Sequence, residues 1–259
     1  YNMIAFGSQS LLGLATDRWR APRLVAALGC GVTAAGVMAF GFSPIPALCV
    51  AGVGNALFHA GGGCISLHYA PGKAAAPGLF VAPGAVGLAL GTIAGTSGYF
   101  TDWIFALLLG ASCLAIGLMG MPRIDYRRPP VETPRGHLLL VLTLLLICIG
   151  IRSLVGLTNV FPWKTDTLPL RARVLATAGG KAVGGLLADR FGWTRVAVGA
   201  LLVSGPLVSL GANWPTLAIP GVFLFQMTMP VTLAAVGLLF PGRASFAFGL
   251  ASLALVVGA

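Results

Sequence analysis

Two positively charged side chains lie inside long apolar stretches of the sequence. Lys181 stands between "VLATAGG" and "AVGGLLA", and Arg152 stands between "LLLICIGI" and "SLVGL". A charge in apolar surroundings is costly and is usually kept where it binds something. Lysine and arginine are the side chains that bind carboxylate and phosphate groups. Because neither stretch contains an acidic partner, the two residues predict a site for an anion.

Helical spacing places further polar groups beside these cations. Steps of three and four residues put Asn159 on the face of Arg152 and Thr177 on the face of Lys181. A third apolar stretch carries Asn55 and His59 at the same spacing. The candidate substrate-binding residues are Arg152, Lys181, His59, Asn55, Asn159 and Gln226.

Some of these side chains also have a purely structural interpretation. Arg152 lies roughly 15 Å from the nearer end of its helix, so its long side chain can extend to the membrane surface. Lys181 lies eight residues before Asp189, roughly 12 Å into its helix, which favours a cavity role. His59 can be a packing residue with a backbone partner, or the titrating group if protons take part in the function.

The acidic residues and cysteines do not suggest catalysis. We place all six acidic residues in loops or at helix ends: Asp17, Asp102, Asp125, Glu132, Asp166 and Asp189. The apolar stretches contain no carboxylate pair, no metal-ligand cluster and no nucleophile beside a base, and the chain has no GxxxxGK[ST] phosphate loop. The five cysteines form no CxxC pair. We therefore expect neither an enzyme nor a bound cofactor or metal.

The composition indicates what surrounds these residues. Of the 259 residues, 57% are hydrophobic and 8% are charged, and the mean hydropathy is +0.93. A soluble domain carries about 25% charged residues, and no soluble fold of this size buries so much apolar surface. The sequence therefore predicts an integral membrane protein. In that setting the net charge of +10 reflects basic loops beside membrane spans rather than nucleic-acid binding.

Apolar runs of about 17–25 residues are long enough to cross a bilayer as helices. We predict ten spans, at 1–15, 24–41, 46–68, 77–97, 102–121, 138–161, 174–188, 195–211, 215–240 and 244–259. The first and last are cut short by the ends of the sequence, so we expect one more helix beyond each. The polar, proline-rich stretch 122–137 predicts a linker between two groups of five spans.

The loops between these spans differ sharply in charge. Eleven of the 16 basic residues fall in loops on one face, whereas the loops of the other face carry only Lys164, Arg171 and Arg173. Basic loops remain on the cytoplasmic side of a membrane. The sequence therefore predicts a multi-pass protein of the plasma membrane, the inner membrane of a bacterium, with the linker in the cytoplasm.

One charged turn occurs twice on that face. "GLATDRWRAPR" at 13–23 and "GLLADRFGWTR" at 185–195 share a glycine, an Asp-Arg pair and a final arginine at the same spacing. A second pair, "YAPGKAA" at 69–75 and "FPGRASF" at 240–246, is separated by nearly the same number of residues. Features paired at a constant offset on one membrane face predict two parallel repeats.

The repeated turn resembles the signature loop of the major facilitator superfamily, G-x-x-x-D-R-x-G-x-x-R, between the second and third helices of each half. The later copy matches throughout, whereas the earlier copy has Arg20 in place of the second glycine. Two shorter stretches are similar to drug exporters of the family. The glycines that follow Pro83 resemble the antiporter motif, although ordinary helix packing explains them equally well, and "GNALFH" at 54–59 is similar to fosmidomycin-resistance-type exporters.

The resemblance implies an all-α membrane protein of two six-helix bundles, related by a pseudo-twofold axis along the membrane normal. It divides the chain into an N-terminal bundle at 1–121 (helices 2–6), a cytoplasmic linker at 122–137 and a C-terminal bundle at 138–259 (helices 7–11). The family works by alternating access, and its fourth, seventh, eighth and tenth helices, which carry the polar residues above, approach the central cavity.

The resemblance also gives the repeated turn a role as a conformational latch. Each aspartate is expected to pair with arginine and with the N-terminus of a neighbouring helix. The alternative is that Asp-Arg only ends a helix and supplies positive charge. Because Gly192 completes the second copy, we expect the tighter latch there. The latch residues are Gly13, Asp17, Arg18, Arg23, Gly185, Asp189, Arg190 and Arg195.

The sequence thus predicts a secondary transporter that moves a small organic anion by alternating access. A proton-coupled drug exporter is the alternative on substrate, and a non-transporting sensor or scaffold with the same fold is the alternative on function. The expected partners are a small-molecule substrate, the lipid bilayer and, if transport is coupled, protons. We expect a monomer that binds no nucleic acid.

Overall fold

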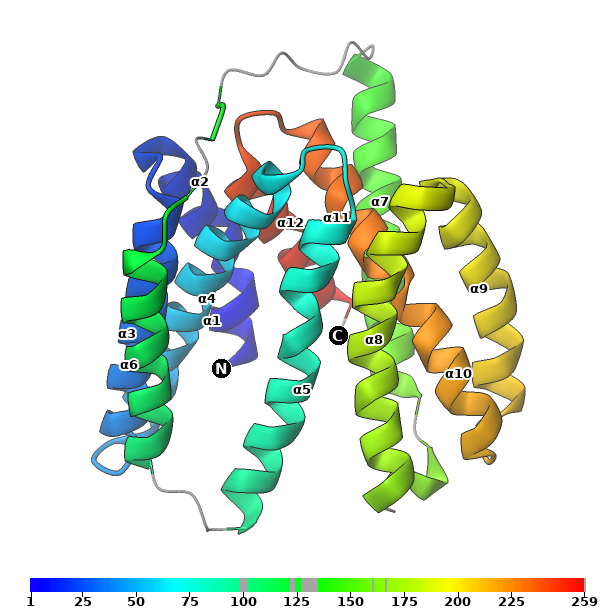
Figure 1. Ribbon diagram of the computed structural model, residues 1–259, viewed down its shortest axis with the longest axis horizontal. Coiled ribbons are helices and arrows are strands. Elements are labelled where there is room, and N and C mark those ends of the chain that lie inside the picture. Colours follow the sequence, from blue (N-terminus) through cyan, green and yellow to red (C-terminus); the bar gives the residue numbers. More distant parts are fainter. Residues whose placement is uncertain (98–101, 122–123, 127–134, 160, 166, 259) are drawn as a thin grey trace. The chain divides into compact units, whose positions relative to one another are not determined.

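Helices make up all the regular structure in the part of the chain that the structure describes. The computed structural model describes residues 1–97, 102–121, 124–126, 135–159, 161–165 and 167–258 (Figure 1). Of the predicted linker 122–137, most residues therefore lie outside the described part. The described residues cluster into two compact units, the first comprising 1–71, 98–153 and 236–259, and the second 72–97 and 154–235.

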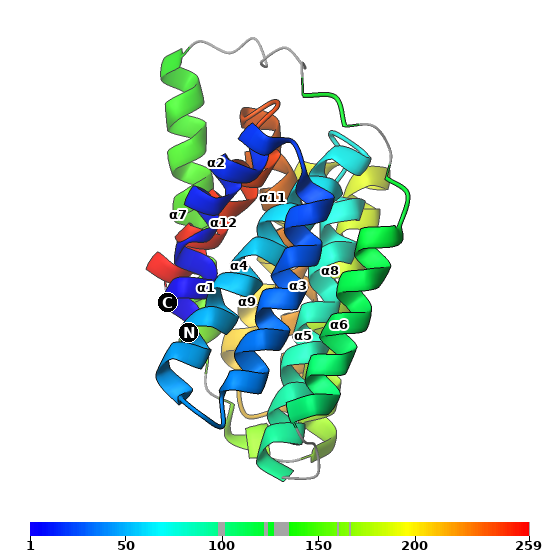
Figure 2. The same cartoon turned by 90° about the vertical axis from the view of Figure 1, so that its left-hand side faces the viewer.

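The first unit is built around α2, α3, α4 and α12. Its helices are α1 (Asn2–Gly7), α2 (Gln9–Trp19), α3 (Pro22–Ala39), α4 (Pro44–Tyr69), α6 (Asp102–Leu118), most of α7 (Arg135–Thr158) and α12 (Ala244–Val257). Prolines at the start of α3 and α4 fit a first turn that needs no N–H donor. Figure 2 shows α2 and α12 side by side, with α4 packed against both.

The second unit is built around α8. It contains α5 (Ala75–Ser97), the 3-10 turn η1 (Pro162–Thr165), α8 (Thr167–Phe191), α9 (Trp193–Leu210), α10 (Pro215–Gln226) and most of α11 (Thr228–Leu239). α8 packs against α5 on one side and against α9 and α10 on the other. At one end, Phe161 stacks on Trp163, whose indole donates a hydrogen bond of 3.0 Å to the carbonyl of Ala212. This contact fixes the loop between α9 and α10.

Each predicted span coincides with a helix or with a pair of helices. The first span is split into α1 and α2 at Ser8, and the span 215–240 is split into α10 and α11 at Met227. Ser8 and Thr228 donate side-chain hydrogen bonds to the carbonyls of Ile4 and Phe225, an arrangement that bends helices. The predicted all-helical class is therefore confirmed, with two interruptions that hydropathy did not reveal.

Among the described residues, six stretches are long and apolar enough to cross a membrane: Pro22–Ala39, Pro44–Tyr69, Ala75–Ser97, Gly136–Thr158, Trp193–Leu210 and Pro215–Leu239. They pack through small residues, as membrane helices do. A Cβ on Gly54 would lie 2.8 Å from the carbonyl oxygen of Gly29, so α3 and α4 touch backbone to backbone. The two units each combine helices from both predicted bundles, and the bundle boundaries stay a prediction.

Candidate functional site

The carboxylate of Asp17 lies at the end of α2 and accepts two hydrogen bonds from the first turn of α12. The donors are the backbone N–H groups of Ser245 and Phe246, at 3.0 and 2.9 Å. The first N–H groups of a helix have no partner within that helix, and the helix dipole favours a negative charge there. Asp17 therefore joins two helices that lie more than 220 residues apart in sequence.

Asp189 forms the equivalent contact in the second unit. It lies near the end of α8 and accepts hydrogen bonds from the backbone N–H groups of Ala74 and Ala75, at 2.8 and 2.9 Å, at the start of α5. The indole of Trp193 donates a third hydrogen bond at 3.2 Å. Each of the two repeated turns therefore binds the N-terminus of a helix from the other predicted half of the chain.

A glycine one helical turn before each aspartate allows this approach. A Cβ on Gly13 would lie 2.5 Å from the carbonyl oxygen of Ser245, and a Cβ on Gly185 would overlap the carbonyl oxygen of Ala74. Any larger residue would keep the aspartate from its donors. The spacing G-x-x-x-D therefore has a steric reason in both copies, because the glycine and the carboxylate face the same helix end.

The donors for both aspartates follow the second repeated motif. Gly72 and Gly242 occupy the same place in the Pro-Gly-Lys/Arg turns, with φ of +77° and +76°, a region that glycine enters without strain. The chain then enters α5 or α12 and presents its N–H groups. Sequence reasoning paired these two turns but did not identify them as partners of the aspartates, because backbone donors have no side-chain signature.

The surroundings of the two carboxylates differ. Asp17 is 8% exposed, and burial raises its pKa, although the N–H donors of Ser245 and Phe246 and the nearby His68 act in the opposite direction. The ionised form of Asp17 is therefore held against a desolvation cost that its two donors only partly offset. Asp189 is half-buried and has the additional indole donor.

The arginines of the two turns have other roles. Among the described residues, no arginine of these turns donates to either aspartate; Arg23 instead donates to the carbonyl of Met119 at 2.8 Å, and Arg190 lies 5.4 Å from the ring centre of Phe191. Arg195 is exposed at the start of α9. Arg18 lines a shallow cleft of about 370 Å³ with Leu14, Asp17, Gly242 and Arg243.

Arg20 has a positive φ, as glycine has at the equivalent position of the second copy. Its φ and ψ are 55° and 32°, in the left-handed region, whereas Gly192 has φ of 98° and ψ of 137°, outside that region. A non-glycine residue pays about 1–2 kcal/mol for the left-handed conformation. The first turn is thus formed despite the missing glycine, and the guanidinium of Arg20 lies 5.5 Å from the ring centre of Tyr126.

Three of the predicted substrate-binding residues belong to the first unit. Arg152 in α7 is 9% exposed, and its Nε has no hydrogen-bond partner in the described part of the chain. His59 and Asn55 are half-buried in α4 and joined by a contact of 3.0 Å between His59 Nδ1 and the carbonyl of Asn55. The ring of His59 lies among Phe58, Phe6 and Phe248.

The other three predicted residues belong to the second unit, and all are half-buried. Lys181 lies in α8, where its carbonyl oxygen touches Gly78 of α5. Gln226 ends α10, and its Cβ lies 3.0 Å from the position that a Cβ on Gly180 would take. Asn159 follows the last residue of α7 and donates its N–H to the carbonyl of Val155. The structure therefore brings the ring of His59 to the backbone carbonyl of Asn55. It also places Gln226 against Gly180, the residue before Lys181.

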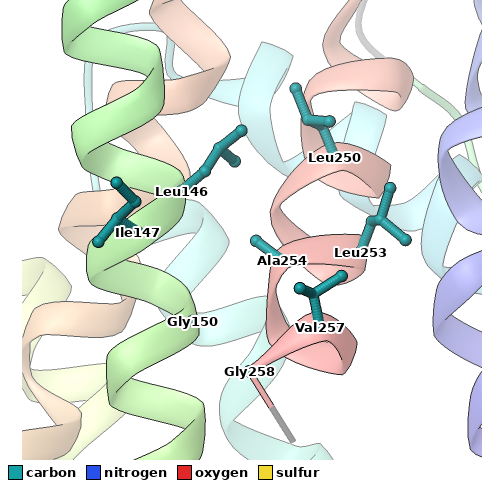
Figure 3. A pocket seen from close by; sticks show the side chains of 8 residues that line it. All are labelled: Leu146, Ile147, Gly150, Leu250, Leu253, Ala254, Val257 and Gly258. Atoms are coloured by element: carbon teal, nitrogen blue, oxygen red, sulfur yellow. The ribbon is translucent and has the colours of Figure 1, made fainter.

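An apolar cavity of about 310 Å³ lies between α7 and α12 (Figure 3). Leu146 and Ile147 face it from α7, and Leu250, Leu253 and Val257 face it from α12. Its lining side chains are all aliphatic, so the cavity offers no group that would recognise a charged solute.

The glycines that resembled the antiporter motif lie in α5 and behave differently from Gly78 of the same helix. A Cβ on Gly78 would lie 2.6 Å from the carbonyl oxygen of Lys181, so that glycine serves the close packing of α5 on α8. A Cβ on Gly84, Gly87, Gly91 or Gly95 would meet no described atom within 4 Å. Close packing within the second unit therefore does not explain these four glycines.

The fold matches those of solved transporters. No protein-family model matches the sequence, and no curated protein is similar enough in sequence to count as a relative. A crystal structure of the major facilitator superfamily transporter FucP in the outward conformation aligns with TM-score 0.70 and 13% identity, over 100% of this chain and 78% of that one.

Two further structures give the same result. A second crystal structure of FucP, the E. coli fucose:proton symporter, in this case a single-residue variant, aligns with TM-score 0.68 and 11% identity, over 100% of this chain and 79% of that one. The human organic anion transporter MFSD10 (TETRAN) aligns with TM-score 0.72 and 17% identity, over 99% of this chain and 74% of that one.

This chain therefore has the fold of major facilitator superfamily transporters, as the resemblance of its repeated turn indicated. With its apolar helices, that fold makes it an integral, multi-pass membrane protein. The similarity of "GNALFH" to fosmidomycin-resistance-type exporters receives no support from these structures and stays a prediction.

Proposed function

We propose that this protein is a secondary transporter that moves a small organic anion across the membrane by alternating access. The observation that carries the proposal is the pair of matching contacts at Asp17 and Asp189. Each contact holds a helix of one predicted half against a helix of the other. A transporter that alternates between two conformations needs contacts of this kind, which form in one conformation and break in the other.

The two contacts also argue against a non-transporting scaffold. Both copies of the turn keep the glycine, the aspartate and a helix N-terminus as partner. A scaffold has no need of the same contact twice, built in each copy from a carboxylate and the N-terminus of a helix. The additional donor from Trp193 supports the expectation that the second contact is the tighter one.

The anionic substrate is inferred from charge. The solved transporters of similar fold move different solutes, since one is a fucose:proton symporter and another an organic anion transporter, so likeness of fold does not choose between them. Arg152 is a buried guanidinium with an unsatisfied Nε in the described part of the chain. A carboxylate or phosphate group on the substrate would supply the missing acceptor. Lys181 is proposed as a second cationic group for the same class of solute.

The proposal includes the placement of the protein. We infer the bacterial inner membrane, with the repeated turns and the linker on the cytoplasmic side, from the distribution of basic residues. We infer a monomer of two bundles, divided at 122–137. If proton movement drives transport, His59 is the group proposed to carry the proton, because a histidine ring titrates near neutral pH when unperturbed.

A transport assay in proteoliposomes tests the substrate class. We expect carboxylates or organic phosphates to be transported, and Arg152→Ala to lower their flux by about tenfold or more, because a charged hydrogen bond contributes roughly 1.5–3 kcal/mol. Lys181→Ala should lower it as well. The panel should include a neutral sugar and cationic drugs, each with and without a pH gradient.

The matched control for these variants is Arg171→Ala, which removes an exposed arginine from the same α8 that carries Lys181. Its flux should stay within about twofold of the original, since surface charges contribute little. Transport of cationic drugs but not of anions would favour the drug exporter instead. Full anion flux in both Arg152→Ala and Lys181→Ala would remove these residues from the substrate site.

A further inference from the structure

Tyr126, which follows α6 in the predicted linker, lies beside the Asp17 contact of the first unit. Its half-buried ring is 5.4 Å from the ring of His68, near the end of α4. The guanidinium of Arg20, just beyond the end of α2, lies 5.5 Å from the centre of the same ring. Two elements on one side of the Asp17 contact therefore hold this single side chain.

The backbone of Tyr126 reaches the other side of the contact. A Cβ on Gly242 would lie 2.5 Å from the carbonyl oxygen of Tyr126, so the backbone of Tyr126 rests directly on the Pro-Gly-Arg turn. That turn positions the first N–H groups of α12, which are the donors to Asp17. Tyr126 thus bridges the aspartate-bearing helix and the helix that binds it.

The left-handed backbone of Arg20 has a reason in this arrangement. Glycine would adopt the φ and ψ of Arg20 without strain. Glycine, however, has no side chain to place over the Tyr126 ring, where an arginine gains a cation–π interaction. The residue that departs from the repeat is therefore the one that contacts the linker.

From this geometry we propose that Tyr126 is a clasp that holds the Asp17 contact closed, acting as a positioning residue with Arg20 and His68 as its binding surface. The inference rests on the proposed role of the Asp17 contact. In the structure Tyr126 lies against Arg20 after α2, His68 of α4 and the turn before α12. Without it, the Asp17 contact rests on the two hydrogen bonds and on the packing of α12 against α2 and α4.

A cysteine native to the chain can report on this contact. Cys64 is fully buried in α4, and its Sγ is 3.5 Å from Nδ1 of His68. Its neighbour Gly63 packs directly against the ring of Phe248 in α12. Separation of α12 from α4 would therefore uncover Cys64. With the other four cysteines replaced by alanine (Cys30, Cys49, Cys113 and Cys148), the rate of maleimide labelling in lipid nanodiscs measures how often the contact opens.

The test compares Tyr126→Ala with Tyr126→Phe. The alanine variant loses the ring, and we expect labelling of Cys64 to rise at least about threefold. The phenylalanine variant keeps the ring beside His68 and Arg20 and loses only the hydroxyl near the Cys64 thiol. Its labelling rate should equal that of the original. Equal rates in the original and in Tyr126→Ala would overturn the clasp.

Arg20→Gly separates the clasp from a general loss of stability. Glycine suits the left-handed turn, so thermal stability should be unchanged or higher, whereas loss of the guanidinium should raise the labelling of Cys64. Because this variant keeps the tyrosine ring, its labelling reports on opening and not on a gap left by a smaller side chain. Unchanged or slower labelling in Arg20→Gly would contradict the proposal.

The labelling assay is also independent of transport. Suppose that Asp17→Ala raises the labelling rate of Cys64 and that anions are transported. If Tyr126→Ala then leaves the labelling rate unchanged, the clasp alone is wrong. If Tyr126→Ala raises labelling and no solute in the panel is transported, the proposed function fails and the clasp stands.

Discussion

Replacing Asp189 with alanine is expected to lower the rate of transport by about tenfold or more while the protein still reaches the membrane. The change removes three hydrogen bonds to one carboxylate, from Ala74, Ala75 and Trp193. A hydrogen bond to a charged group contributes roughly 1.5–3 kcal/mol. Even one such loss moves the balance between two conformations by about tenfold or more.

Hydrogen exchange gives a direct measure of the same change. The N–H groups of Ala74 and Ala75 precede or begin α5, so they have no partner within that helix. Their protection depends on Asp189, and it should be lost in Asp189→Ala. In Asp189→Asn one acceptor oxygen remains, so protection and transport should lie between the two. Asp102→Ala is the matched control, because it removes an exposed carboxylate from the start of another helix.

Asp17→Ala should have the smaller effect of the two aspartate variants. Asp17 has two donors where Asp189 has three, and burial raises its pKa, which means that its ionised form is less well stabilised. The two contacts are therefore alike in geometry but unequal in strength. Wild-type transport and unchanged amide protection in Asp189→Ala would remove the second contact from the mechanism.

The positions of the helices could be predicted from the sequence because the bilayer dictates their length. Each long apolar run contained one span, and most charges lie at or beyond the ends of the runs. Arg171 and Arg173, which we assigned to a loop, lie in the first turns of α8.

The break at Ser8 could not be predicted, since it coincides with a single hydroxyl group. The break at Met227 lies just before Pro230, whose missing N–H leaves the carbonyl of Gln226 without its helical partner. Ser8 and Thr228 bond to carbonyls of their own helix or the preceding one, and many serines and threonines do so without interrupting a span.

The repeated turn was predictable as a motif, and a helix N-terminus was expected as partner of each aspartate, but the particular helices, α5 and α12, were not predicted. Asp17 and Asp189 stood out because each lies in a copy of the repeated turn. Their donors are backbone N–H groups of alanine, serine and phenylalanine, residue types that carry no signal for anion binding. Only the second repeat, with a Pro-Gly-Lys/Arg turn before α5 and α12, pointed to them. When a turn with a positive-φ glycine leads into a helix, the N–H groups of the first helical turn are candidates for binding an anion.

Arg20 illustrates a different limit of sequence reasoning. In a one-dimensional comparison it is a defect, because arginine replaces a glycine and makes the turn costlier. In three dimensions the same residue contacts Tyr126, more than 100 residues later in the chain. A residue that departs from a repeat should therefore be examined for the contact that its side chain makes.

The steric requirement at the two glycines leads to the second large effect. Gly185→Val should abolish most transport, because a Cβ at this position overlaps the carbonyl oxygen of Ala74. A backbone atom cannot move aside as a flexible side chain can, so α5 must shift away from α8. That shift separates Asp189 from both of its backbone donors at once. Gly13→Val should do the same to Asp17 at the carbonyl of Ser245.

Gly199→Val is the matched control for Gly185→Val. It introduces the same side chain in the middle of α9, where a Cβ would meet no described atom within 4 Å. Valine has a better helix propensity than glycine, so stability should be unchanged or slightly higher. Transport and protection of the Ala74 and Ala75 amides should match the original protein. Equal losses in Gly199→Val and Gly185→Val would indicate a general effect of bulk in these helices.

A double variant decides whether the glycine and the aspartate serve one contact. If Gly185→Val already separates Asp189 from its donors, adding Asp189→Ala should lower transport no further. Mutations that act on a shared contact are strongly non-additive, whereas independent ones multiply their effects on a rate. A double variant whose loss equals the product of the two single losses would show that Gly185 acts elsewhere. An equal loss in the single and double variants would place both residues in the same contact between α8 and α5.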